Sequence, residues 1–495
     1  MQQMRLPLFY NLQDVIRKSD FHRKYDLLFQ SLDLSTVRDT NTGVGRTGYS
    51  RHAMLRAFIV KHLEEIKSVP RLIEFLDAHP VLTEMCGFEM GTLPDESQFY
   101  KFLSQTNTSV IETLHHAVNQ KLIDADVVSL SHFIMDSKPV MAATRHNNFK
   151  NPRRNTRNKY MLPKRNLSAT LSYYSYQQVD GKKDNFIFFW GYRTHVIVSK
   201  EGIPLVSLTL PNKVTDATVA QKLIKKLKRL YRFRKGAFFI ADAAYDERDF
   251  YNFIVNQFHG QAFIPINPRN QQAPKTLGPH GCPLCDAGLE MSSNGTWTEG
   301  LRQRAKFRCP IKASAKVAFQ SPDGCPIHHA RFTQAKAYGC TKYLDITDDP
   351  RAQVPRDSAF FKQTFNLRTE VERYFSRLGE REVEQTTHYK MRAIRNQMTI
   401  AHLSMSLIAY AAAILLDQPE NPVLPHFCRS GAPFSPRRLN APILQEPLSQ
   451  QSPSAQTCSF RAFSHAPCPF LSHPRLQTLN QRSFCRSLWF DVYIP

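Results

Sequence analysis

Apolar residues in the first 125 positions recur at the spacing of a helix. Before Ser68, five of them are three or four residues apart and share one helical face: Leu55, Phe58, Ile59, Leu63 and Ile66. Ser68 is a residue type that caps helices, and Pro70 fits the first turn of the helix that follows. Pro80 and Pro94 mark two further short helices. We therefore expect residues 1–125 to form a helical domain.

Between residues 126 and 265 the pattern changes to short apolar runs. Six of these runs predict strands: His132–Asp136, Asn185–Phe189, His195–Ser199, Pro204–Leu210, Ala237–Ala241 and Gln261–Pro265. A helix capped by Thr215 or Asp216 is predicted to extend to about Tyr231. Strands interleaved with such a helix predict an α/β core with a mixed sheet.

The pattern divides the rest of the chain into three parts. Residues 266–355 are rich in Gly, Pro, Lys and Cys and read as an insertion, whereas 356–420 returns to helical spacing with helices at 358–380 and 389–417. The apolar run Leu403–Leu416 is too short to span a bilayer, so we expect a buried helix. No secretory signal is visible at the start of the chain.

The last segment, residues 421–495, predicts a disordered tail. It holds 11 of the 31 prolines and only two acidic residues, Glu446 and Asp491. Its unpatterned mixture of Cys, Phe, Pro and Ser is typical of translation past a natural end or in a shifted frame, which we keep as a hypothesis.

Three carboxylates stand out at the ends of apolar segments. Asp136 and Asp242 each end a predicted strand, and Glu372 lies on a predicted helix. A few carboxylates satisfy Mg²⁺, and two such ions can drive in-line displacement at phosphorus. Arg368 lies four residues before Glu372, so an ordinary surface ion pair is the alternative interpretation of that position. The combination of all three favours a metal site.

The charge of the chain indicates the class of substrate on which such a metal site would act. The formal net charge is +23, and such a field attracts polyanions. Two basic clusters stand out, namely Lys222–Lys235 and the loop Arg145–Arg165, which includes Arg153, Arg154 and Arg157 and has no acidic residue. A carboxylate cage in a basic protein predicts phosphodiester chemistry on nucleic acid. Arg51, His52 and His62 are weaker candidates for DNA contact, because such residues more often lie on a solvated face.

Five of the ten cysteines lie between Cys282 and Cys340. Without an export signal, clustered thiols favour metal binding over disulfides. Tetrahedral Zn²⁺ needs four ligands, and the tentative set is Cys282, Cys285, Cys309 and Cys325. His280, His328, His329 and Cys340 are rival ligands. A structural zinc would fold a small module that lacks a core of its own.

Together these motifs resemble one family. The run from about Gly45 to Leu416 is similar to the bacterial insertion-sequence transposases with an Asp-Asp-Glu site. Asp136-Ser137 and the segment Ala241–Asp246 resemble the first and second aspartate motifs. Arg368 and Glu372 keep the arginine-to-glutamate spacing of a glutamate helix of the tyrosine-arginine-glutamate-lysine type. The chain departs from it at Phe365, where the family has tyrosine, and at Gly379, where it has lysine.

The resemblance implies an α/β fold with an RNase H-like mixed-sheet core in two parts, 126–265 and 356–420. A DNA-end-binding helical domain at 1–125 would precede it, and a cysteine-rich, zinc-ribbon-like module at 266–355 would interrupt it. Asp136, Asp242 and Glu372 would hold two Mg²⁺ or Mn²⁺ ions for cleavage at the element's ends and strand transfer. Arg368 and Arg373 would contact phosphate, with Arg377, Arg381 or Lys390 as a substitute for the missing lysine.

The implied partners are the terminal inverted repeats, target DNA and a second copy of the chain in a synaptic homodimer. The implied location is the bacterial cytoplasm, on the nucleoid, and no membrane role is expected. Two alternatives stay open: another RNase H-like DNA nuclease, and an inactive transposase descendant that only binds DNA as a regulator. An adaptor with zinc alone would leave the strands that carry Asp136 and Asp242 unexplained.

Overall fold

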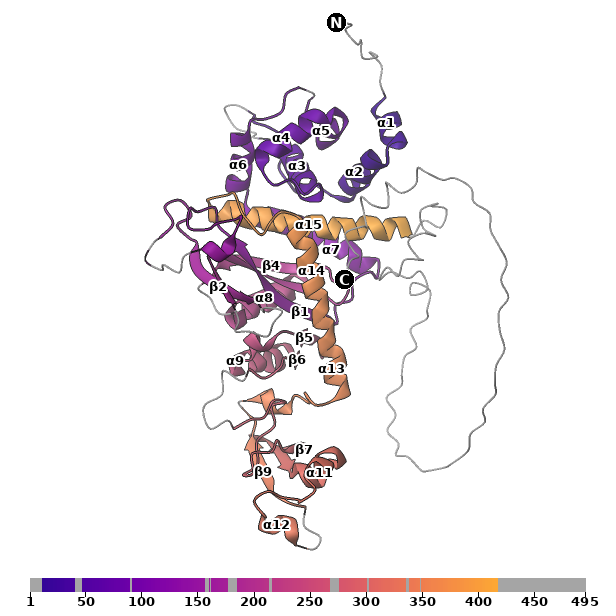
Figure 1. Ribbon diagram of the computed structural model, residues 1–495. Coiled ribbons are helices and arrows are strands. Elements are labelled where there is room, and N and C mark those ends of the chain that lie inside the picture. The colour runs from indigo at the N-terminus through magenta and orange to yellow at the C-terminus, as the bar shows by residue number, and fades with distance from the viewer. Residues whose placement is uncertain are drawn as a thin grey trace, which may run out of the picture. The chain divides into compact units, whose positions relative to one another are not determined.

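A six-stranded mixed β-sheet lies at the centre of the fold in this computed structural model (Figure 1). The strands are β1 His132–Met141, β2 Thr170–Tyr176, β3 Asn185–Ser199, β4 Pro204–Pro211, β5 Phe238–Ile240 and β6 Gln261–Phe263. Their order is β2-β3-β1-β5-β6, and β4 also pairs with β3. β1 is antiparallel to β3 and parallel to β5. The predicted α/β core with a mixed sheet is therefore confirmed.

The structure describes residues 11–40, 47–89, 91–155, 160, 162–176, 185–212, 216–267, 276–300, 302–334, 338–347 and 349–416. The chain divides into two units, Met1–Ala413 and Ile414–Pro495. The predicted tail at 421–495 and the DNA-binding candidate Arg157 lie outside the described residues.

β3 differs from its prediction because it is one long strand where two were expected. The gap between Asn185–Phe189 and His195–Ser199 is closed by Gly191, which pairs with both β1 and β2. A Cβ at Gly191 would collide with the backbone carbonyl oxygen of Val140 on β1. Only glycine permits this close approach, so the residue that reads as a strand breaker in the sequence allows the strand to continue.

Within the described residues, seven helices precede the sheet, and the third of them, α3, ends at Leu63, before the last residue of the predicted helical face, Ile66. They are α1 Leu12–Lys18, α2 Asp20–Ser31, α3 Arg51–Leu63, α4 Val69–Ala78, α5 Pro80–Cys86, α6 Glu96–Gln105 and α7 Thr108–Asp124. The Ser68 side chain caps α4 by accepting a hydrogen bond from the Arg71 N–H, as expected. The limit of a separate domain at residue 125 stays a prediction.

His62 of α3, a weaker candidate for DNA contact, does not face solvent. Its side chain is fully buried, and its Nδ1 donates a hydrogen bond to the Arg381 carbonyl over 3.1 Å. Burial lowers the pKa of His62 to about 3, so the imidazole is neutral. Helical spacing assigns His62 to a face of α3 but does not reveal that the end of another helix covers that face.

The long helix α15, Met391–Leu416, contributes to two apolar clusters. One set of its residues packs with the N-terminal helices: Ala393, Ile400, Leu403, Leu407 and Ala411. Another set packs with the sheet and the glutamate helix: Ile394, Met398, Ala401 and Met405. By length and composition Met391–Leu415 could cross a membrane, but 67% of its most apolar window is buried inside the fold. It is the expected buried helix, longer than the apolar run alone.

The remaining elements surround the sheet and form the insertion (Figure 1). The core carries α8 Asp216–Leu230, α9 Arg248–Asn252, α13 Ala359–Phe365 and α14 Thr369–Glu380. The insertion contains a three-stranded sheet of β7 Ser292–Glu299, β8 Arg302–Arg308 and β9 Thr341–Asp345, with α10 Pro310–Ala313, α11 Ala315–Gln320 and α12 Ala330–Thr333. Short 3-10 turns occur at Pro152–Arg154, Ala243–Tyr245, Pro350–Gln353 and Asn366–Arg368, and a π turn occurs at Phe253–Gln257. The turn at Asn366–Arg368 divides the single helix predicted for 358–380.

Leu403→Ala tests the packing of α15. Leu403 is fully buried, so we expect the free energy of unfolding to fall by about 2–5 kcal/mol, measured by urea denaturation followed by circular dichroism. Arg392→Ala, at an exposed position of the same helix, should change it by less than about 0.5 kcal/mol. Equal losses in the two variants would contradict the described packing.

Candidate active site

Asp136 and Asp242 follow a pair of residues that are matched on neighbouring parallel strands. Ile134 of β1 pairs with Ile240, the last residue of β5; Asp136 lies two residues further along β1, and Asp242 lies two residues beyond the end of β5, in extended backbone. Because side chains alternate between the faces of a strand, residues two positions apart project from the same face. The pairing of β1 and β5 therefore brings the two predicted aspartates together.

The electrostatics of Asp136 agree with this geometry. Its pKa is raised to about 7, first by burial and then by the charges of Asp242 and Asp216, whereas the Ser137 N–H and Arg368 lower it. The pKa of Tyr245, in the turn after Asp242, is raised by burial and by the charges of these three aspartates. A carboxyl group in such surroundings needs a cation before it ionises fully at neutral pH.

Glu372 approaches the site on α14. This helix packs its apolar face, which includes Val371, Tyr374 and Phe375, into the cluster that contains Ile134 of β1. The Glu372 carboxylate accepts a hydrogen bond from Arg368 Nη2 over 2.6 Å, and its side chain is 50% exposed. Since Arg368 also lowers the pKa of Asp136, one guanidinium is close to both the strand carboxylate and the helix carboxylate.

Asp216, the first residue of α8, lies near these carboxylates, which the sequence did not reveal. The sequence indicates only a helix cap at this position. Its carboxylate lies 3.8 Å from Arg193 Nη1 and 3.6 Å from His195 Nδ1, and Arg193 also donates a hydrogen bond to Ser137 Oγ. No local pattern distinguishes a capping aspartate from a site aspartate, because the pairing of distant strands decides which one it is.

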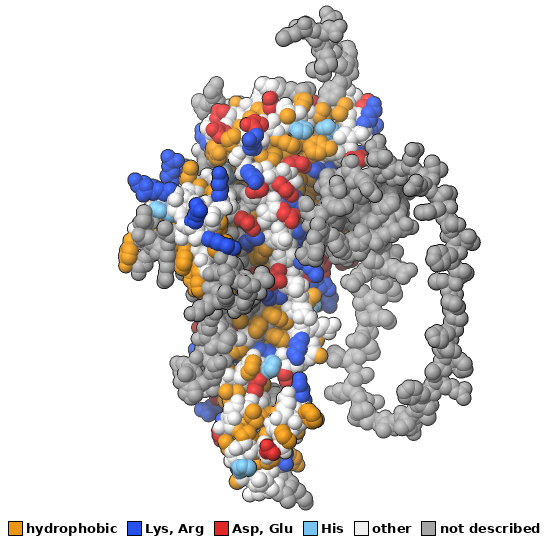
Figure 2. All heavy atoms as spheres, viewed as in Figure 1, with side chains coloured by type: hydrophobic (Ala, Val, Ile, Leu, Met, Phe, Trp, Pro, Cys, Tyr) orange, Lys and Arg blue, Asp and Glu red, His pale blue; other side chains and the backbone are white. Residues whose placement is uncertain are grey.

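The arginines predicted to bind DNA differ in exposure. Arg153 and Arg154 are exposed in the turn after Pro152, and Arg373 is exposed while paired with Glu370. Arg377 is partly buried and donates a hydrogen bond to the Gly202 carbonyl. Figure 2 shows Lys and Arg side chains gathered on the side of the molecule near β2. The outer face of α8 adds exposed cations at Lys222, Lys225, Lys228 and Arg229.

A lysine ammonium group lies beside Gly379, the position at which the family has lysine. Lys138 Nζ lies 3.4 Å from the position that a Cβ at Gly379 would take. The same ammonium group lies 2.7 Å from a Glu384 carboxylate oxygen and donates a hydrogen bond to the Phe375 carbonyl. A residue of β1 therefore brings positive charge to this part of α14.

Three cysteines of the insertion lie close to one another. Burial and the neighbouring thiols of Cys309 and Cys285 raise the pKa of Cys340 to about 12, so these three are close. Cys282 is buried in one apolar cluster with Cys285, and Cys325 is buried outside that cluster. Among the described residues, no group of three or more His, Cys, Asp or Glu side chains is arranged as a metal site, in the insertion or at the sheet.

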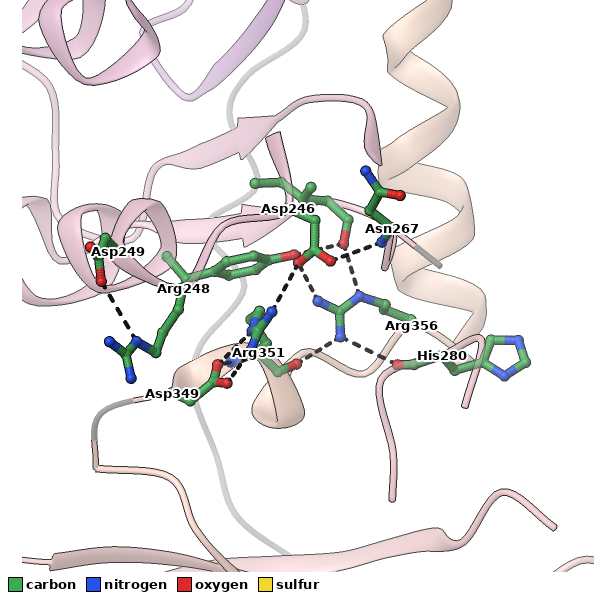
Figure 3. A network of polar contacts seen from close by, with 10 residues as sticks. Asp246, Arg248, Asp249, Asn267, His280, Asp349, Arg351 and Arg356 are labelled. Carbon is green, nitrogen blue, oxygen red and sulfur yellow. Dashed lines mark hydrogen bonds and ion pairs between the residues drawn. The ribbon is translucent and has the colours of Figure 1, made fainter. Parts of the chain in front are cut away.

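A network of buried polar contacts joins the insertion to the sheet (Figure 3). Arg356 donates hydrogen bonds to the carbonyls of Ile264, just after β6, and of His280 and Arg351, near the two ends of the insertion. Asp246, four residues after Asp242, accepts a hydrogen bond from the Asn267 N–H and lies 3.9 Å from Arg351. The segment that follows Asp242 is thus fastened to both ends of the insertion.

Comparison with known proteins gave two family matches. A family described as "Transposase DDE domain" matches residues 129–407, more than half of the chain, and one described as "Transposase domain (DUF772)" matches residues 10–105. No curated protein matches the chain. A solved structure titled "Cryo-EM structure of piggyBac transposase synaptic complex with hairpin DNA (SNHP)" is similar at 10% identity, over 88% of this chain and 84% of that one, with a TM-score of 0.31.

The raised pKa of Asp136 predicts a pH-dependent effect of Asp136→Asn in metal-free protein. Between the unfolded pKa near 4 and the folded pKa of about 7, the folded state binds a proton that the unfolded state lacks. The stability that Asp136 contributes is therefore present at low pH and lost as the pH rises through about 7. Asp136→Asn should be more stable than the unmodified chain at about pH 8, with a smaller advantage at about pH 5.

Urea denaturation in EDTA at both pH values measures this difference. Asp249→Asn, at an exposed position of α9, is the matched control. A stability difference for Asp136→Asn that stays constant from about pH 5 to about pH 8 would contradict the raised pKa.

Proposed function

The chain belongs to the DDE transposase family and is a DNA transposase, and we propose that Asp136, Asp242 and Glu372 are its catalytic carboxylates. Enzymes of this family are nucleases and DNA strand transferases. The observation that carries the proposal is the pairing of Ile134 with Ile240, because Asp136 and Asp242 each follow two residues after this pair. Glu372 joins them through Arg368, whose charge acts on Asp136.

DDE transposases generally use divalent metal ions such as Mg²⁺. The carboxylate oxygens of Asp136, Asp242 and Glu372 are the donor type that Mg²⁺ and Mn²⁺ prefer, and the raised pKa of Asp136 reflects a place that a cation would stabilise. We infer that these residues hold two such ions. Bound there, the ions would activate the attacking hydroxyl and stabilise the leaving 3′ oxygen.

The residues of the chain then have separate tasks. Arg368 is bonded to Glu372 here, and once that carboxylate turns to a cation the guanidinium becomes available for a DNA phosphate. In the first step water attacks the phosphodiester at an element end, a new P–O bond forms, and the bond to the 3′ oxygen breaks. In the second step the freed 3′-hydroxyl attacks a target phosphodiester, which releases a target 3′ oxygen.

Several surfaces are proposed to hold the DNA. The helices of residues 1–125 would recognise the terminal inverted repeats, while Arg153, Arg154, Arg157, Arg373 and Arg377 would bind backbone phosphate along with Arg368. Two copies of the chain would pair the two element ends in a synaptic homodimer. The site of action would be the bacterial cytoplasm, on the nucleoid.

The insertion is proposed to bind one structural Zn²⁺ through thiols. Cys282, Cys285 and Cys309 are three of the predicted ligands, and all are buried. Cys325 and Cys340 compete for the fourth position. The closeness of Cys340 to Cys309 and Cys285 favours Cys340, whose backbone neighbour Gly339 would place a Cβ within 3.0 Å of Cys309 Sγ.

Glu372→Gln tests the catalytic assignment. We expect it to reduce Mg²⁺-dependent strand cleavage, on DNA that carries the flanks of the protein's own gene, by at least about 100-fold. Glu370→Gln is the matched control, because Glu370 lies on the same helix and pairs with Arg373 at 2.5 Å, as Glu372 pairs with Arg368. Comparable losses in both variants would contradict a specific role for Glu372. Tight DNA binding without cleavage by the unmodified chain would favour the regulator.

Cys340→Ser and Cys325→Ser test the zinc site. We expect about one equivalent of zinc in the purified chain, a loss of most of it in Cys340→Ser, and little loss in Cys325→Ser, by elemental analysis. Cys86→Ser, which removes a buried thiol outside the insertion, should retain the zinc. Less than about half an equivalent in the unmodified chain would rule out the site, and the reverse order of the two variants would restore Cys325 as the ligand.

A further inference from the structure

Asp216 lies beside the predicted catalytic aspartates but on a different element. β1 pairs with β3 so that Ser137 is opposite His195, and the start of α8 brings Asp216 to this pair. The Ser137 side chain donates a hydrogen bond to the Asp216 carboxylate, and His195 Nδ1 is 3.6 Å from it. The carboxylate is therefore next to the residue that follows Asp136.

His195 gives a second and independent observation. Its side chain is only 2% exposed, and among the described residues its Nδ1 has no hydrogen-bond partner. A buried polar nitrogen without a partner costs free energy unless a ligand or an ordered water supplies the missing bond. This nitrogen points to the side on which Asp216 lies.

Arg193 and Arg368 each lie beside one carboxylate of this region. Arg193 Nη1 lies 3.8 Å from Asp216 and donates a hydrogen bond to Ser137 Oγ over 3.2 Å, while Arg368 binds Glu372. Each guanidinium supplies the positive charge that a carboxylate needs when no metal ion is bound. The charges of Asp136, Asp242 and Asp216 all raise the pKa of Tyr245, so the three carboxylates lie near the same side chain.

We propose that Asp216 is a fourth carboxylate of the divalent-ion site, which binds a cation directly or through an ordered water that His195 also contacts. This inference rests on the proposed catalytic site at Asp136, Asp242 and Glu372. A fourth carboxylate would add one more oxygen donor of the type that divalent cations prefer. Arg193 holds Asp216 in place from the side of β3.

The test is a calorimetric titration of the full chain with Mn²⁺ alone, without DNA. Asp216→Asn should weaken Mn²⁺ binding by about 10-fold to 100-fold, since it removes the negative charge but keeps the size of the side chain. Asp216→Glu should restore part of the affinity. Asp249→Asn, which removes an aspartate paired with Arg248 on α9, should leave the affinity unchanged.

Asp136→Asn separates failure of this inference from failure of the proposed site. Weaker binding in Asp136→Asn with unchanged binding in a folded Asp216→Asn overturns the role of Asp216 alone, which is then a partner of Arg193. Unchanged binding in both variants overturns the site at the sheet as well. If circular dichroism reveals that Asp216→Asn is unfolded, Asp216→Ser, which suits a helix start, takes its place in the same comparison.

Discussion

The burial of α15 between two apolar clusters is the constraint on which the other elements depend. One side of this helix completes the core of the N-terminal helices, and another completes the core between the sheet and α14. His402 of α15 also forms a hydrogen bond with the Tyr374 hydroxyl of α14. The helix that carries Glu372 is therefore held by a helix that also organises residues far from the site. A helix with apolar residues on two sides resembles a membrane-spanning helix in composition, but α15 is surrounded mostly by the apolar side chains of the protein itself.

The far end of α14 is tied to the N-terminal helices by reciprocal hydrogen bonds. His62 of α3 donates to the Arg381 carbonyl, and Arg381 donates to the Leu63 carbonyl. At the other end of the catalytic sheet, Arg356 joins β6 to the insertion. The element that carries Glu372 and the segment after Asp242 are thus each fastened to a region that precedes or interrupts the core.

The sequence predicted what depends on local pattern. Short-range periodicity identified the cap at Ser68 and the strands that carry or precede Asp136 and Asp242. Its end for the first strand was wrong, because β1 continues through Asp136 to Met141. It did not predict the continuity of β3, because Gly191 is favoured there by a carbonyl on another strand. It did not predict the surroundings of Asp216, the burial of His62 or the contact of Cys340 with Cys309, since each depends on a residue distant in the chain. The break at Asn366–Arg368 was missed because it interrupts a helix without Gly or Pro.

Positive charge from arginine already lies beside two of the carboxylates at the sheet. Arg368 pairs with Glu372 and Arg193 with Asp216, whereas Asp136, which forms no side-chain ion pair within the described part of the chain, is kept protonated in part by burial. A divalent cation at the proposed site would have to displace a proton from Asp136 and compete with both arginine pairs, so its binding would depend on pH. Because β1, α8 and α14 each contribute one of these carboxylates, bound cations would also join three elements that are distant in the sequence. Cation binding at the proposed site would therefore add to the stability of the folded state.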